Sequence, residues 1–175
     1  TLRASVDSET GQSLLSGMGE LHLDVTLKRI EREFGIKLGF GKPRVSYRET
    51  VREAASGSAS YQRQVGGEQL SARVRLRVEP LPDQGAKTEV RDGLRPGTIP
   101  SAFLPALRDS VANAAEGGGI YGYPVTGVAA TLEDAAFTES GQPEIAINSA
   151  ASHAFREALS AAGPVVLEPY GRLEI

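Results

Sequence analysis

The chain has 175 residues, of which 40% are hydrophobic and 23% charged, a composition typical of a folded globular protein. Its formal net charge of −3 gives no overall attraction to nucleic acid or anionic lipid, so any such contact must use a local basic patch. The lack of cysteine excludes disulfides and thiolate chemistry, and no apolar run approaches the roughly 18 residues of a membrane-spanning helix, so we expect a cytoplasmic protein without membrane contacts.

The first segment, residues 1–41, has the pattern of a small strand and helix fragment. LRASVD and SLLSGM predict two strands around a turn at SETG. Apolar residues recur at helical spacing over residues 19–34, Gly35 can end that helix, and IKLGF predicts a further strand. These elements are too few to enclose a core, so we expect an incomplete domain that an upstream part completes.

The second segment, residues 42–163, has the pattern of a whole α+β domain. Alternating apolar residues predict strands in VSYRETV, SYQRQV and SARVRLRVEP, followed by a turn-rich stretch, DQGAKTEVRDGLRPG. Helices are predicted over residues 101–116 and 144–162, each ended by glycine. Between them, YPVTGVAATL predicts a strand that leads into an acidic loop at residues 132–147. Residues 164–175 begin a third segment.

The motifs of common catalytic and cofactor sites do not occur in the sequence. There is no phosphate-binding G-x-x-x-x-G-K-[ST] loop, and the glycines of EGGGIYG follow a helix, which is the wrong order for a dinucleotide site. The only histidines, His22 and His153, lie on different predicted helices and lack the spacing of metal ligands. We therefore expect no catalytic, cofactor or metal site within this chain.

One group of side chains indicates a charged partner. Arg63, Arg73, Arg75 and Arg77 can share one face of a sheet, because residues of the same parity on a strand point the same way. Arginine binds phosphate well and stacks on bases. A solvated sheet face explains the same spacing equally well, so the pattern alone leaves both interpretations open.

Several longer stretches resemble the elongation factor G family. GMGELHLDV and GKPRVSYRET, at residues 17–25 and 41–50, look like the junction of its third and fourth domains. IPSAFLPALRDSV and GYPVTGV resemble the following helix and strand, and VVLEPYGRLEI resembles the entry into the fifth domain. The resemblance implies an incomplete ferredoxin-like piece of domain III, then a domain IV similar to domain 2 of ribosomal protein S5, then the start of domain V.

The same resemblance implies a fragment of a ribosome-dependent GTPase. The nucleotide-binding domain, with its GTP and magnesium ion, is expected upstream, which agrees with the missing phosphate loop. Domain IV is the arm of the family, which reaches the decoding site and occupies the place vacated by the A-site transfer RNA. The expected partners are ribosomal RNA and the paired transfer and messenger RNAs, and the protein is expected to be a monomer.

In the family, two loops form the tip of this arm. One typically reads Q-S-G-G-R-G-Q-Y-G-H-V, and the aligned stretch here is QVGGEQLSARV, with Gly66 and Gly67 kept, Glu68 in place of arginine and Arg73 in place of histidine. On the other loop, Thr138 takes the place of a histidine that touches RNA. These five residues are the expected RNA contacts.

The changed tip indicates a divergent paralogue. Arg63, Arg75 and Arg77 are further candidates for phosphate contacts along the arm. Translocation is the function that the resemblance favours. A paralogue acting in ribosome recycling or ribosomal protection remains an alternative, as does a stand-alone S5-like RNA-binding module or an enzyme on that fold.

Overall fold

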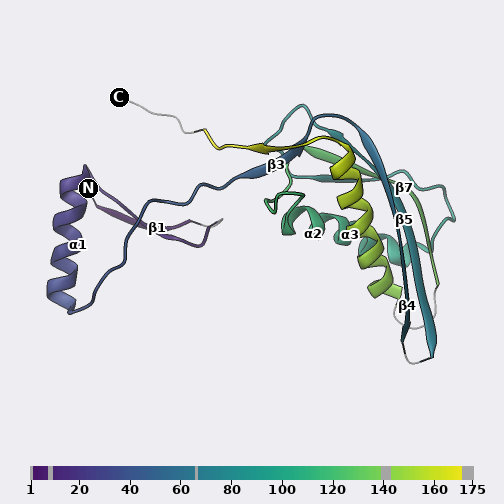
Figure 1. The fold of residues 1–175 in the computed structure, drawn as a ribbon, viewed down its shortest axis with the longest axis horizontal. Helices are drawn as coiled ribbons and strands as arrows, with labels where there is room; N and C mark the ends of the chain where they lie inside the picture. Colours follow the sequence, from purple (N-terminus) through teal and green to yellow (C-terminus); the bar gives the residue numbers. More distant parts are fainter. Residues whose placement is uncertain (1, 8–9, 66, 139–142, 171–175) are drawn as a thin grey trace. The chain divides into compact units, whose positions relative to one another are not determined.

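A computed structural model describes residues 2–7, 10–65, 67–138 and 143–170 of the chain (Figure 1). The chain divides into two compact units. The first comprises Thr1–Ser46 with Pro169–Ile175, and the second is Tyr47–Glu168. None of the described helices has the length and apolar character needed to cross a membrane.

The first unit contains a two-stranded sheet and one helix. Strands β1 (Arg3–Val6) and β2 (Ser13–Ser16) pair antiparallel, and helix α1 spans Glu20–Phe34. Gly35 ends α1 in the left-handed conformation, with φ of 65°, which glycine adopts without a steric penalty. No described residue of this unit is buried, so the apolar side chains of α1 are not covered within the part that the structure describes.

The strand predicted at IKLGF is not present. Residues 36–40 have no regular secondary structure. A strand is stable only when a neighbouring strand pairs with its backbone groups, and the described residues provide none here. The backbone amide of Leu38 instead donates a hydrogen bond of 3.0 Å to the carboxylate of Glu31, on the last part of α1.

The second unit is built on a four-stranded sheet with two helices packed on one face (Figure 1). The order in the sheet is β4-β5-β7-β6, antiparallel except for the β6–β7 pair. Its strands are β4 (Ala55–Val65), β5 (Glu68–Pro80), β6 (Glu89–Asp92) and β7 (Val128–Phe137). A short 3₁₀ turn, η1 (Ser101–Phe103), precedes α2 (Leu104–Gly117), and α3 spans Pro143–Ala161.

A second, two-stranded sheet lies within the same unit. Strand β3 (Arg48–Val51) pairs antiparallel with β8 (Pro164–Leu167). The beginning of the predicted third segment therefore returns to pair with the beginning of this unit. As a result, the chain enters and leaves the unit through adjacent strands (Figure 1).

The core lies between the inner face of the large sheet and the two helices. On β5, the inward side chains of Val74, Leu76 and Val78 are fully buried. They pack with side chains from α2 and α3 that recur at helical spacing, namely Leu107, Val111, Ile147, Phe155 and Leu159. Because strand side chains alternate between faces, this burial turns Arg73, Arg75 and Arg77 to the outer face.

The acidic stretch was predicted to be a loop over residues 132–147, but residues 132–137 belong to a strand and residues 143–147 to α3. Strand β7 runs to Phe137 and includes Glu133 and Asp134. The register against β5 shifts between Arg75 and Leu76, which marks a β-bulge at Glu133. Ala135 and Ala136 continue the strand, with Ala135 buried and Ala136 exposed. Both residues are small and apolar, so the sequence shows no alternation of apolar and polar residues beside the two carboxylates.

Candidate functional site

The hairpin formed by β4 and β5 has a tight end. Val65 pairs with Glu68, so the strands are joined through residues 66 and 67 alone. Gly67 has φ of +88°, in the region where a β-carbon is disfavoured, so glycine is needed there. Gly66 lies outside the described residues. The backbone conformation of the turn therefore favours glycine at position 67.

The second predicted loop begins beside this hairpin. The Thr138 amide donates to the Ser71 carbonyl at 2.9 Å, and the two hydroxyl oxygens are 2.7 Å apart. Ser71 lies about 10 Å along β5 from Glu68, at about 3.4 Å per residue. Two stretches far apart in the sequence thus meet at one end of the unit (Figure 1). Residues 139–142, which continue the loop, are outside the described part of the chain.

The predicted contact Arg73 lies farther along β5 from the hairpin turn than Ser71 does. Arg73 is two places beyond Ser71 on β5 and points to the outer face of the sheet. An aromatic contact supports the neighbouring backbone, since the rings of Phe103 and Phe137 meet edge to face with centroids 4.9 Å apart. Along β5, Glu68 is three residues from Ser71, the partner of Thr138, and Arg73 is two residues from it on the other side. Thr138 therefore lies between the hairpin turn and Arg73.

Arg63 does not share a face with the other arginines. It pairs with Leu70, which is buried on the helix-facing side, so its exposed side chain leaves from that side of the sheet. The prediction of four arginines on one face is therefore wrong for Arg63. The physical reason is the register of the hairpin, which pairs odd-numbered residues of β4 with even-numbered residues of β5. Paired residues share a face, so odd-numbered residues lie on the inner face of β4 and on the outer face of β5.

Two of the outer arginines form ion pairs within the sheet. Arg73 Nη2 is 3.3 Å from Asp134 Oδ2, and Arg75 Nε is 3.0 Å from Glu133 Oε2. Both pairs are solvent-exposed, so each contributes at most about 1 kcal/mol to stability. Among the described residues, no ion pair reaches Arg77, which is exposed on the same face.

Sequence patterns gave no indication of the buried carboxylate of Glu49. Its side chain is 2% exposed. It accepts hydrogen bonds from three loop amides: Ile120 N at 2.7 Å, Tyr121 N at 2.9 Å and Tyr123 N at 2.8 Å. The EGGGIYG stretch is therefore a helix end followed by a loop, as expected, and Glu49 of β3 fixes that loop. Its strand, Arg48–Val51, reads RETV, so no apolar pattern in the sequence sets Glu49 apart from an exposed carboxylate.

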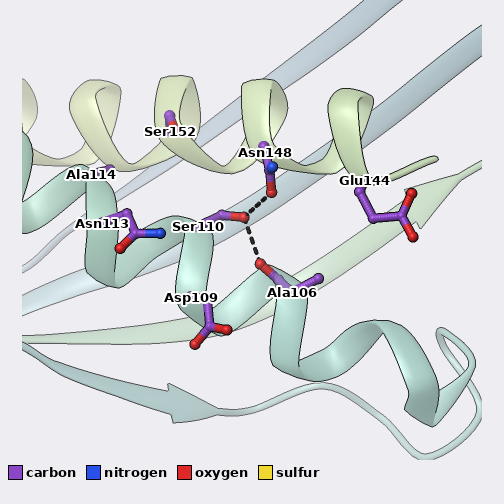
Figure 2. Close-up of a pocket in the computed structure, with 8 residues that line it drawn as sticks. All are labelled: Ala106, Asp109, Ser110, Asn113, Ala114, Glu144, Asn148 and Ser152. Atoms are coloured by element: carbon purple, nitrogen blue, oxygen red, sulfur yellow. Dashed lines mark hydrogen bonds between the residues drawn. The ribbon is translucent and has the colours of Figure 1, made fainter. Parts of the chain in front are cut away.

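A polar groove separates parts of α2 and α3 (Figure 2). Its volume is about 430 Å³, and its lining includes Asp109, Asn113, Glu144 and Asn148. The Ser110 hydroxyl lies 2.5 Å from the Ala106 carbonyl and also contacts Asn148, and it can donate its single proton to only one of them at a time. The described residues hold no cluster of three His, Asp or Glu side chains suited to a metal ion.

The chain is similar to known proteins along its whole length. The family "Elongation factor G, domain IV" matches residues 43–163, and "Elongation Factor G, domain III" matches residues 1–42. Elongation factor G of Thermotoga neapolitana is 43% identical over 176 residues, covering 100% of this chain and 25% of that protein. That of Aquifex pyrophilus is 41% identical over 175 residues, with the same coverage.

A solved structure has the same fold. The crystal structure of a Thermus thermophilus protein matches with a TM-score of 0.80 and 33% sequence identity. The match covers 94% of this chain and 24% of that chain. The chain thus spans about a quarter of the length of the curated relatives it matches.

Proposed function

Because the chain belongs to the elongation factor G family and spans its domains III and IV, we propose that it is the ribosome-binding arm of a translational GTPase that promotes translocation of transfer and messenger RNA. GTP and magnesium are bound, on this proposal, by a nucleotide-binding domain outside this chain. As a translation factor, the protein acts as a monomer in the cytoplasm.

The meeting of two separate loops at one end of the second unit carries this proposal. The β4–β5 hairpin and the loop that begins at Thr138 are joined through Ser71. A long hairpin held by an eleven-residue ladder, Ala55–Val65, is a stiff element on which to present such a tip. A stiff hairpin of this kind can carry the side chains at its tip into a narrow binding site without bending.

The proposed contacts at the tip are Gly66, Gly67, Glu68 and Thr138, with Arg73 behind them. Arg75 and Arg77 extend a cationic row along the outer face, and Arg63 reaches RNA from the other side of the hairpin. No covalent step is assigned to these residues. The arm acts by favouring the ribosomal state to which it binds more tightly, while GTP hydrolysis elsewhere sets its position.

Restoring the usual family residues at the tip tests this placement. The double change Glu68→Arg and Thr138→His should strengthen binding to pre-translocation ribosomes and steepen its salt dependence. Removing a repelled carboxylate and adding a cation near phosphate should change the slope of log affinity against log salt by roughly 0.7–0.9. Binding is measured by sedimentation over a salt series.

A charge reversal away from the tip provides the control. The control variant is Glu116→Arg. Glu116 is exposed at the end of α2 and shares a pocket lining with Val125 and Thr126, which precede β7, whereas the tip loop follows the other end of β7. The control variant should leave the salt slope nearly unchanged. Equal slopes for the tip variant, the control and the unmodified chain would place the tip away from RNA.

A further inference from the structure

The outer face of the large sheet carries two adjacent rows of side chains that bind phosphate well. One row, on β5, is the arginine row: Arg73, Arg75 and Arg77. Directly opposite in the register of β4 lies the serine row: Ser60, Ser58 and Ser56. All six residues are exposed. Guanidinium groups bind phosphate with two parallel hydrogen bonds, and serine hydroxyls donate to the same oxygens.

The spacing of these rows suits an extended anionic chain. Side chains on one face of a strand recur about every 6.7 Å, at two residues of about 3.3–3.4 Å each. Three arginines in succession therefore make a straight cationic line of constant pitch, with a hydroxyl beside each member. An RNA backbone, with one phosphate per nucleotide, matches this repeated donor pattern better than a single small anion does.

Two carboxylates of β7 compete for the same donors. Asp134 pairs with Arg73, and Glu133 pairs with Arg75. The Ser56 hydroxyl also donates to Glu133, at 3.4 Å. The bulge at this point of β7 inserts Glu133 as an extra residue between paired positions, which places two adjacent carboxylates against the arginine row.

We propose that this outer face is an RNA-backbone surface whose affinity is set by Glu133 and Asp134. The inference deepens the function proposed above and rests on it. The arginine side chains are 64% and 59% exposed in their ion pairs, so a phosphate can approach from solvent and replace each carboxylate. The carboxylates lower the affinity of the face by holding two of its three arginines and by repelling phosphate.

Neutral isosteres of the two carboxylates test this competition. The double variant Glu133→Gln and Asp134→Asn keeps the side chain shapes while releasing Arg75 and Arg73. The probes are a fluorescein-labelled RNA duplex of about 20 base pairs, read by anisotropy, and purified 30S subunits. The variant should bind the duplex about tenfold more tightly at roughly 50 mM salt, with a salt slope steeper by roughly 1.4–1.8, because two further phosphates are contacted.

Matched variants separate this effect from a change in net charge. Asp109→Asn with Glu116→Gln removes the same two charges from exposed positions on α2, which packs on the opposite face of the sheet. This control should leave the affinity within about twofold. Adding Arg73→Gln and Arg75→Gln to the neutralised variant should abolish its gain. Melting temperatures should stay within a few degrees, since exposed ion pairs contribute little to stability.

The results distinguish this inference from the proposed function. A gain confined to the Glu133 and Asp134 variant, and lost with the arginines, supports the inference. Equal gains in the α2 control, or no gain in either, overturn it. Absence of 30S binding by the unmodified chain counts instead against the proposed function, whichever way the paired variants behave on the duplex.

Discussion

Replacing Glu49 by glutamine is expected to lower the free energy of unfolding of the Tyr47–Glu168 unit by about 2–4 kcal/mol. The carboxylate is buried, and both of its oxygens accept from loop amides, two at Oε1 and one at Oε2. A glutamine amide has one oxygen and one NH₂ group. In either orientation, the NH₂ group faces at least one backbone N–H, which loses its acceptor.

Urea denaturation measures this effect, with Glu53→Gln as the matched control. Glu53 follows the same strand and is exposed, so its change should alter stability by less than about 0.5 kcal/mol. The shape of the side chain is the same in both variants. If Glu49→Gln were as mild as Glu53→Gln, the hydrogen bonds of Glu49 would not be holding the loop.

Replacing Gly57 by alanine is expected to destabilise the same unit by about 3 kcal/mol, at the upper end of the usual cost of overpacking. A β-carbon on Gly57 would lie 2.4 Å from both the Ala154 carbonyl oxygen and the Ala158 nitrogen. Those atoms belong to the backbone of α3, so no side chain rotation can relieve the contact. The whole helix must move away from β4, and the buried side chains beneath it lose their packing.

Gly117→Ala is the control for the change of residue type. Gly117 is the last residue of α2, and a β-carbon there would meet nothing within 4 Å. Alanine should be neutral or slightly stabilising at this position, because it restricts the unfolded chain without straining the folded one. A similar melting temperature for both variants would show that α3 does not rest closely on β4.

The elements with a long repeated pattern could be predicted from the sequence. Helices expected over residues 101–116 and 144–162 are found as η1 with α2, over 101–117, and as α3, Pro143–Ala161. The alternation of arginine with valine and leucine on β5 also gave the correct inner and outer faces. In each case, many apolar residues recur at the same helix or strand spacing, so the local secondary-structure preference agrees with the packing of the core.

Short or mixed patterns gave wrong or missing elements. Strand β6, Glu89–Asp92, was hidden in a turn-rich stretch because its four residues are stabilised by parallel pairing with β7. IKLGF looked like a strand but has no pairing partner among the described residues. The acidic residues of β7 looked like a loop because charge concealed the alternation on its other face.

Only part of the candidate site could be predicted from the sequence. Resemblance to a family, and not the spacing of residues, indicated the two tip loops, and the contact of Thr138 with Ser71 places them together. The ion pairs on the outer face join residues 58 and 61 positions apart, so no local pattern could indicate them. The assignment of Arg63 to that face failed because it depended on the parity across the hairpin turn.

Transfer of this chain into a relative tests the translocation proposal most directly. The segment of Thermotoga neapolitana elongation factor G that aligns with this chain can be replaced by the whole chain. The chimera is added with GTP to pre-translocation ribosomes, and a toeprint records the position of the messenger RNA. We predict a three-nucleotide advance, as with the unmodified factor. A chimera that binds ribosomes and hydrolyses GTP but leaves the toeprint unmoved would contradict the proposal and indicate that this arm serves another step on the ribosome.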